Sequence, residues 1–210
     1  MTDMTLYASP ASPYARKTRV VADELGLTPR IQVVTAQPRT DAAFHAVNPA
    51  RRIPALQLAS GRVLVDSRVI CEYFDDLAGG SELFPRTGEA RWESLTLHAL
   101  GDGIADWAVP LRNETLRPAP QQSPDFIERA RAAILGIVHD VAGRIDARSR
   151  LSVGTLSVAC ALDYLNFRFA SQGPDDTQGI DWQSGHKGLV AWLADVSARR
   201  SMKTTDPRAG

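Results

Sequence analysis

The sequence of 210 residues lacks both a surplus of charge of one sign and long apolar runs. Lys plus Arg and Asp plus Glu number 24 each, and this balance argues against a general nucleic-acid binder. No apolar stretch approaches the roughly 20 residues that span a bilayer. The N-terminus does not show the basic and apolar segments of a secretion signal. We therefore expect a soluble, cytoplasmic protein without a nucleic-acid or membrane partner.

Cysteine is scarce as well, and histidine shows no pattern of a metal site. The two cysteines, Cys71 and Cys160, are far apart and lie within apolar helical patterns, which predicts buried reduced thiols rather than a disulfide framework. The four histidines do not have the spacing of metal ligands. Glycine-rich phosphate-binding motifs are missing too. The sequence thus predicts no metal and gives no support for nucleotide binding.

What the first 80 residues do contain is an alternation of strand and helix patterns. A short apolar run at residues 6–8 predicts a buried strand that ends in a turn. Ser12-Pro13 then has the order of an N-cap and a first helical residue, and the helix is expected to stop at Gly26. A second strand is predicted at residues 31–33. A strand, a helix and a strand in succession predict a parallel strand pair.

A hairpin and a further helix follow in the same region. Residues 55–58 and 63–65 flank Ser60-Gly61, which predicts two antiparallel strands. Asp66-Ser67 precedes an amphipathic pattern that ends at Gly79, which predicts a capped helix. Residues 1–80 are therefore expected to form a small α/β domain, and residues 81–88 a linker.

From residue 89 onward the sequence shows helical periods without a convincing strand. One of the predicted helices is apolar almost all round, which is typical of the centre of a bundle. Residues 173–184 read as a polar loop. The sequence predicts an all-helical domain over residues 89–210, with helices at about 89–116, 124–149, 155–170 and 186–199.

Three short motifs in the small domain have ordinary structural explanations when taken singly. Ser12-Pro13-Tyr14-Ala15 is explained by helix capping. Asp66-Ser67 is equally explained as a second cap. Ile53-Pro54 lies just before a predicted strand, and only about 5–6% of such bonds are cis in folded proteins. Taken alone, each motif is better explained by a structural role than by a functional one.

Together these motifs resemble the cytosolic glutathione S-transferase family, in particular its bacterial members with a serine facing the thiol. Ser-Pro-Tyr-Ala matches the Cys-Pro-Tyr-Cys turn of glutaredoxins with both cysteines replaced. Residues 48–56 are similar to the family's cis-proline segment, and residues 65–70 to its acidic-Ser-x-x-Ile element. Leu83-Phe84-Pro85 and Ala191-Trp192 also fit, so the resemblance covers nearly the whole chain. It implies a thioredoxin-like N-terminal domain followed by an all-helical C-terminal bundle.

The resemblance implies a glutathione site and glutathione as co-substrate. Ser12 is expected to donate a hydrogen bond to the glutathione thiolate, because the thiolate is the reactive species and a helix N-terminus favours an anion. Ser9 is a second candidate in the same turn. The backbone of Ile53, turned outward by a cis Pro54, is expected to pair with the cysteinyl part of glutathione. The expected contacts of the two ends of glutathione are Asp66 and Ser67 for the γ-glutamyl group and Arg52 for the glycyl carboxylate.

The activity implied is transfer of glutathione to a hydrophobic electrophile, as in detoxification, or its use to cleave or reduce a substrate. The acceptor is expected between the domains, against Tyr14, Trp107 and Leu111. The alternative is a scaffold or binding protein that keeps the cleft but has no useful turnover, since fold alone does not decide function. The family's habit also implies a two-fold homodimer, with Arg68 or Glu72 available for pairing across it.

Two departures from the family pattern carry consequences. The turn at Ser12 has no cysteine, so disulfide exchange by the protein itself is not expected. The Ser-x-x-Asp capping box of the central helix reads Ser157-Val158-Ala159-Cys160. Without the aspartate this box cannot form in the usual way, and Thr155 is expected to cap the helix instead.

Overall fold

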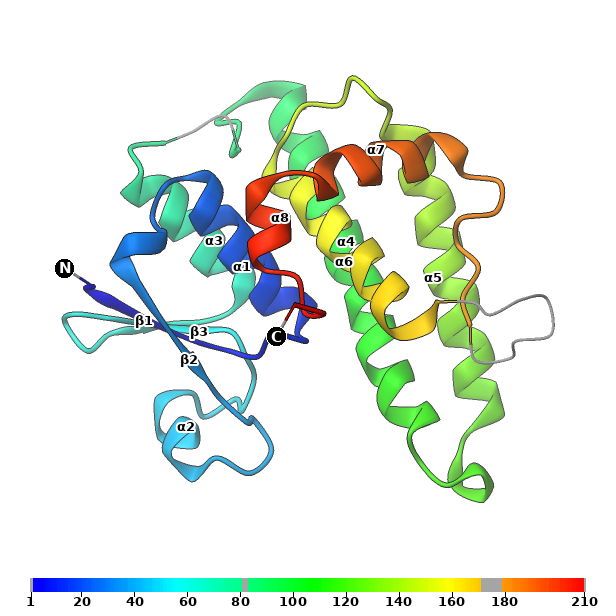
Figure 1. Ribbon diagram of the computed structural model, residues 1–210, viewed down its shortest axis with the longest axis horizontal. Helices are drawn as coiled ribbons and strands as arrows, with labels where there is room; N and C mark the ends of the chain where they lie inside the picture. Colours follow the sequence, from blue (N-terminus) through cyan, green and yellow to red (C-terminus); the bar gives the residue numbers. More distant parts are fainter. Residues whose placement is uncertain (1, 81–82, 171–178, 210) are drawn as a thin grey trace. The chain divides into compact units, whose positions relative to one another are not determined.

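A computed structural model of the chain describes residues 2–80, 83–170 and 179–209, in two compact units (Figure 1). The first unit consists of Met1–Arg91 together with Arg199–Gly210, and the second of Trp92–Ala198. The sequence analysis placed all of residues 89–210 in the helical domain. The structure instead assigns Arg199–Gly210 to the first unit. Residues 81–82 of the expected linker and 173–178 of the expected loop lie outside the described residues.

A four-stranded sheet in the order β2-β1-β3-β4 forms the first unit. Strand β1 (Met4–Ala8) pairs in parallel with β2 (Ile31–Thr35). On its other side β1 pairs antiparallel with β3 (Ala55–Leu58), which forms the hairpin with β4 (Val63–Leu64). The predicted parallel pair and the predicted hairpin are both confirmed.

Helices cover this sheet because alternate strand residues point to opposite faces. Helices α1 (Pro13–Glu24) and α3 (Ser67–Leu77) pack together, and α3 contacts β3. The short helix α2 (Ala42–Val47), which the sequence analysis did not predict, packs Phe44 against Ala55 and Tyr7. The first unit is therefore a thioredoxin-like domain, as expected.

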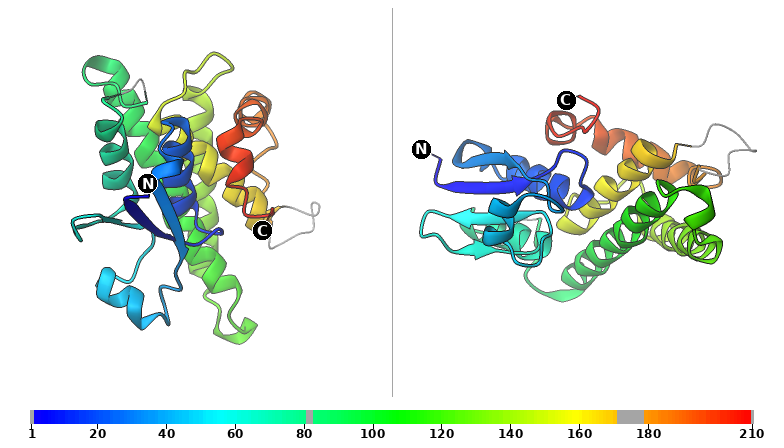
Figure 2. Two further views of the ribbon diagram at one scale, coloured as in Figure 1. Left: turned by 60° about the vertical axis from the view of Figure 1, so that its left-hand side comes forward. Right: turned by 90° about the horizontal axis from the view of Figure 1, so that it is seen from below.

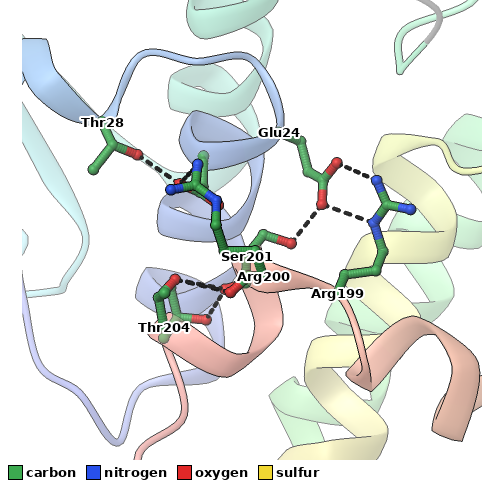
Figure 3. A network of polar contacts seen from close by, with 8 residues as sticks. Glu24, Thr28, Arg199, Arg200, Ser201 and Thr204 are labelled. Atoms are coloured by element: carbon green, nitrogen blue, oxygen red, sulfur yellow. Dashed lines mark hydrogen bonds and ion pairs between the residues drawn. The ribbon is translucent and has the colours of Figure 1, made fainter.

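The C-terminal segment holds α1 through a network of polar contacts (Figure 3). Arg199 donates to both carboxylate oxygens of Glu24 at 2.9 and 2.6 Å, and the Ser201 hydroxyl donates to the same carboxylate. Arg200 pairs with Asp23 at 2.7 Å. Nearer the start of α1, the buried Arg16 donates to the Met202 carbonyl at 3.1 Å. The segment that includes α8 (Arg200–Thr204) thus contacts α1 along most of its length.

The second unit contains no strand among its described residues. Its helices are most of α4, then α5, α6 and α7, with one 3-10 turn between α4 and α5, whereas another 3-10 turn lies in the first unit. Helix α5 ends at Arg144, earlier than the predicted residue 149, because Asp146 accepts a hydrogen bond from Arg148 N–H and turns the chain. No described helix has both the length and the apolarity to cross a membrane. The bounds are α4 Gly88–Thr115, α5 Pro124–Arg144, α6 Val153–Phe169, α7 Lys187–Ser197, and the 3-10 turns Thr28–Arg30 and Ala119–Gln121.

Helices α4 and α6 cross at very short range (Figures 1 and 2). A Cβ atom on Gly154 would lie 2.2 Å from the Ser94 carbonyl oxygen, and one on Gly101 would lie 2.6 Å from the Ser157 backbone. The Ser157 hydroxyl lies 3.3 Å from the His98 carbonyl and 3.3 Å from Asp102 Oδ1. Glycine is required at both positions because the neighbouring group is backbone, which cannot move aside.

The cap of α6 corrects the sequence analysis. The capping box joins Ser152 and Thr155: Thr155 N–H donates to Ser152 Oγ at 3.2 Å, and Ser152 N–H donates to Thr155 Oγ1 at 2.8 Å. Thr155 takes part as the third residue of the box, and Ser152 is the N-cap. The helix begins at Val153, two residues earlier than predicted, so its cap falls on Ser152, and Ser157 lies within the second turn rather than at the cap.

The glycines at the α4–α6 crossing provide a first prediction. Gly154→Ala is expected to destabilise the protein by about 1–3 kcal/mol, since the added methyl must push backbone apart. The control is Gly136→Ala on α5, where nothing lies within 4 Å of the new Cβ. That variant is expected to gain up to about 1 kcal/mol from helix propensity. Thermal melts of both variants measure the contrast, and an unchanged Gly154→Ala would contradict the close crossing.

The contacts of Glu24 with Arg199 and Ser201 provide a second prediction, which concerns the pH dependence of stability. The hydrogen bond from Arg199, followed by that from Ser201, lowers the pKa of Glu24, against a rise caused by burial. A lowered pKa contributes stability above the unfolded value, and that stability is lost as pH falls through the folded value. Glu24→Gln is therefore expected to cost about 1–2 kcal/mol at pH 7 and progressively less below about pH 4.5.

Melting temperatures of the wild type and Glu24→Gln between pH 3 and 7 measure this difference. The exposed Glu128 provides the control, because the same substitution there is expected to leave melting almost unchanged. A difference in melting temperature between wild type and Glu24→Gln that stays constant down to pH 3 would contradict a stabilising role for the ionised Glu24.

Candidate functional site

The turn between β1 and α1 places two serines at the start of a helix. Ser12 is the N-cap of α1: its Oγ accepts a hydrogen bond from Ala15 N–H at 3.3 Å, and Pro13 follows as the first helical residue. Ser12 N–H donates to the Ser9 carbonyl at 3.1 Å, which closes the turn. Because a hydroxyl can accept and donate at once, the Ser12 hydrogen remains available to a ligand. The cap predicted from sequence is confirmed.

The local field at this turn favours an anion. Helix α1 has no acidic residue in its first turn, and its N–H groups carry the positive end of the helix dipole. Basic side chains follow within two turns at Arg16, Lys17 and Arg19. Burial, followed by the nearby charge of Arg16, lowers the pKa of Arg19. The start of α1 therefore favours an anion through its helix dipole.

The segment before β3 is shaped by Asn48, whose importance the sequence analysis missed. Its amide donates to the Arg52 carbonyl at 2.6 Å, and its oxygen accepts from Ala50 N–H at 3.0 Å. The side chain is only 2% exposed, so these bonds hold the loop from inside. The signal available was Asn48-Pro49, which is typical of a turn.

Two backbone features follow within this loop. Arg51 has a φ of +53°, which lies in the left-handed region. This conformation is unfavourable for a residue with a Cβ atom and costs glycine nothing. The Ile53–Pro54 peptide bond is cis, as the resemblance implied. Among the described residues, the backbone of Ile53 makes no hydrogen bond, so its N–H and C=O are open to a ligand.

Helix α3 begins with the third motif. Asp66 is its N-cap, and its Oδ1 accepts a hydrogen bond from Arg68 N–H at 2.9 Å. The carboxylate is exposed, so its other oxygen faces solvent, whereas Ser67 is 3% exposed. The Val65–Asp66 peptide bond is also cis. The predicted cap is confirmed.

Strand pairing brings these three motifs to one edge of the sheet. Tyr7 near the end of β1 lies opposite Ala55 at the start of β3, and Leu56 lies opposite Leu64 at the end of β4. Since both pairs are antiparallel, the turn after β1, the loop before β3 and the start of α3 meet at the same edge. Arg52 lies in that loop and is exposed. The set of residues at this edge is Ser9, Ser12, Arg52, Ile53, Pro54, Asp66 and Ser67.

The residues expected to contact a second substrate are divided between the two units. Tyr14 lies on α1 in the first unit and is partly exposed. Trp107 and Leu111 lie on α4 in the second unit. Trp107 is partly exposed and contacts the ring of Phe126 at 6.2 Å between centroids, whereas Leu111 is completely buried. Of these two, Trp107 has the surface that a ligand could reach. Their role in binding stays a prediction.

The described residues do not assemble a metal site. Between residues 2 and 209, leaving aside 81–82 and 171–178, no three His, Cys, Asp or Glu side chains gather as metal ligands would. Cys71 and Cys160 are both buried thiols in helices, as predicted.

Comparisons with known proteins agree with the geometry. The family model "Glutathione S-transferase, N-terminal domain" matches residues 11–77, which include all three motifs. A solved structure of a glutathione transferase family member from Pseudomonas fluorescens Pf-5, with bound glutathione, is 39% identical to this chain. The match covers 97% of this chain and 98% of the other, with a TM-score of 0.86. This chain belongs to the glutathione S-transferase family.

Two further relatives lie within the same family. A glutathione S-transferase structure from Methylobacillus flagellatus with glutathione bound is 32% identical, with a TM-score of 0.81, and the match covers 97% of this chain and 99% of that one. The uncharacterized GST-like protein YibF of Escherichia coli is 29% identical over 97% of this chain and 98% of its own length. The glutathione S-transferase fold therefore spans the chain, with a thioredoxin-like domain followed by a helical one.

Proposed function

We propose that this chain is a glutathione transferase that activates the glutathione thiol for attack on a hydrophobic electrophile. The observation that carries the proposal is the meeting of Ser12, Ile53 and Asp66 at one edge of the sheet. The relatives from Pseudomonas fluorescens and Methylobacillus flagellatus, both with bound glutathione, support glutathione as the ligand. Glutathione acts here as co-substrate, and the scheme requires no metal.

Thiol activation rests on the start of α1. The nucleophile is the thiolate, so the protein must favour the deprotonated sulfur over the protonated one. Ser12 Oγ already accepts from Ala15 N–H, and its hydrogen can therefore be donated to the sulfur. The helix dipole adds to this stabilisation. We assign the role to Ser12 rather than Ser9, because Ser12 holds the cap position.

The rest of glutathione would bind along the same edge. The open backbone of Ile53 would pair with the cysteinyl part as an added strand does, with the cis Pro54 behind it. Asp66 would hold the ammonium of the γ-glutamyl group, and Ser67 with the N–H groups of α3 would hold its carboxylate. Arg52, which is exposed, would face the glycyl carboxylate.

For the acceptor we propose an apolar electrophile, with Tyr14 and Trp107, which are partly exposed, as contact residues. Leu111 is completely buried, so it would support the site from behind the surface. The competing proposal is a binding or scaffold protein with the same fold and without turnover. Retention on immobilised glutathione combined with turnover of a chlorinated aromatic or an isothiocyanate favours the transferase, and retention without turnover favours the scaffold.

We also propose a homodimer that covers an exposed face of the first unit. Val65 and Val69 are 42% and 46% exposed, and Glu72 follows on the same helix as Val69. A groove of about 260 Å³ runs beside them. Arg68 and Glu72 could pair across a two-fold contact there. The groove is lined by Arg62, Leu64, Val69, Glu72, Tyr73 and Asp76.

Ser12→Ala tests the activation of the thiol. We expect turnover to fall about 30- to 150-fold, as for the loss of a hydrogen bond to a charged group, with a small loss of glutathione affinity. The pKa of bound glutathione, followed by thiolate absorbance, should rise. This readout matters because Ser12→Ala also removes a helix cap worth about 1 kcal/mol of stability.

Ser9→Ala is the matched control in the same turn. It should keep both the activity and the thiol pKa of the wild type. If Ser9→Ala loses activity while Ser12→Ala keeps it, the thiol contact belongs to Ser9 instead.

Asp66→Asn tests the γ-glutamyl contact without removing the cap, because asparagine caps helices as well as aspartate does. Losing the charge should raise the KM for glutathione about 10- to 100-fold and change kcat little, because this end of glutathione does not change charge in the reaction. Asp41→Asn, at the N-cap of α2, should leave both constants unchanged. Equal saturation curves for Asp66→Asn and wild type would remove Asp66 from the site.

A further inference from the structure

Strand β2 forms an open edge of the sheet in the first unit. The sheet order is β2-β1-β3-β4, so β2 pairs with β1 on one side and, among the described residues, has no strand on its other side. The side chains of Gln32, Val33 and Thr35 are exposed, that of Val33 to 48%. A partner can therefore reach the outer side of β2 from solvent.

Hydrogen bonds at the two ends of β2 show which of its residues face outward. In a strand, the backbone groups of successive residues point to opposite edges. Asp3 N–H donates to the Arg30 carbonyl at 3.1 Å, and Ala36 N–H donates to the Ala8 carbonyl at 3.0 Å. The even-numbered residues of this strand therefore point their backbone groups toward β1, and the odd-numbered residues point theirs away from it.

Three residues of β2 thus direct their backbone groups outward, namely Ile31, Val33 and Thr35. The Ile31 N–H donates to the Thr28 carbonyl, in the turn that precedes the strand. Within the described residues, the Ile31 carbonyl and the backbone groups of Val33 and Thr35 make no hydrogen bond. A row of donors and acceptors with this spacing is what an added β-strand pairs with.

The competing explanation is an edge that is simply covered by water. Edge strands of that kind usually carry a charge, a proline or a bulge, or are very short, which prevents pairing with another strand. Ile31–Thr35 has no charge and no proline, and it pairs with β1 at every position without a bulge. At the opposite edge β4 is only 2 residues long. Strand β2 therefore lacks the protection that β4 has.

We propose that β2 pairs with β2 of a second copy of this chain, antiparallel about a two-fold axis at Val33. In this register the two Val33 residues exchange their N–H and C=O groups in a hydrogen-bonded pair. On each side of the axis, Thr35 N–H donates to the Ile31 carbonyl of the other copy. The Ile31 N–H, which already donates to Thr28, is not needed.

A second copy fits this edge because the open groups are symmetric about Val33. The pairing brings no like charges together, since Arg30 lies opposite Ala36 of the other copy and the strand itself is uncharged. Val33 pairs with Leu6 in the sheet register, so its side chain lies on the face of the sheet that Leu6 occupies. The two exposed Val33 side chains would cover each other there, as cross-strand neighbours do.

The contact is independent of the proposed transferase activity and of the homodimer proposed above. That homodimer uses a groove that includes Leu64 on β4, whereas β2 lies at the opposite edge of the sheet. Both contacts can therefore form in the same assembly. Two paired strands of this length bury little surface, so we expect weak association, with a Kd on the order of 100 µM.

Cross-linking of Val33→Cys in the full chain tests the register. The two Cα atoms at the axis would lie about 5.5 Å apart, within the range that a disulfide bridges. Thr35→Cys is the matched control, because it is exposed on the same face but its counterpart would lie about 14 Å away. Cys71 and Cys160 are buried. With diamide as oxidant, Val33→Cys should give a covalent dimer on non-reducing electrophoresis, and Thr35→Cys at least about tenfold less.

Charge exchange at the same position tests the two-fold axis, because residue 33 would face its own copy. Val33→Lys and Val33→Glu should each associate about fivefold more weakly than wild type in sedimentation velocity, since like charges would lie opposite each other. An equimolar mixture of the two should recover the association of the wild type.

Three results would overturn the proposal. They are the absence of a Val33→Cys dimer, equal cross-linking of Thr35→Cys, and a mixture of Val33→Lys and Val33→Glu that associates no better than either variant alone. None of them bears on glutathione turnover, so the proposed transferase activity stands or falls separately. Should a charged variant fail to fold, the two cysteine variants still decide the outcome.

Discussion

The antiparallel pairing of β1 with β3 is the constraint on which the candidate glutathione site depends. It sets Tyr7 opposite Ala55, and this register places the Ser12 turn beside the loop that carries Ile53 and the cis Pro54. The hairpin then adds Asp66 at the same edge. A slip of one residue would reverse the faces of β3, because side chains alternate along a strand. The site is therefore a consequence of register as much as of residue type.

The helix that carries Ser12 is fixed at both ends by different means. At its N-terminus the cap is local, with Ser12 bound to Ala15 three residues away. Toward its C-terminus the chain's last segment holds it through Glu24, Arg199 and Ser201. This second contact makes the C-terminal segment part of the first unit. The proposed contact of the Ser12 hydroxyl with a sulfur atom would benefit from such support, because small displacements at a reacting centre reduce rate strongly.

The second unit is organised by the crossing of α4 and α6. Gly101 and Gly154 allow the two backbones to approach, and the Ser157 hydroxyl finds acceptors at His98 and Asp102 where they meet.

Local sequence determined the features whose partners lie within a few residues. The caps at Ser12 and Asp66, the hairpin at Ser60-Gly61 and the buried central helix all follow from nearby residues, and the structure confirms them. Resemblance to the family added the cis Pro54, which local signals alone left open.

Tertiary structure alone decided the contacts between distant segments. Glu24 and Arg199 are 175 positions apart, and a charge pair at that separation leaves no periodic or local signal. The buried Arg16 likewise donates to the Met202 carbonyl, 186 positions away. The Asn48 bonds that shape the Ile53 loop and the capping box at Ser152 join near neighbours instead, and the sequence analysis missed them because it did not locate the turn at Asn48 or the start of α6 correctly. The physical reason is that hydrogen bonds and ion pairs act over a few ångströms. Local sequence predicts those between neighbours in the chain, and only folding determines which distant groups come within that range.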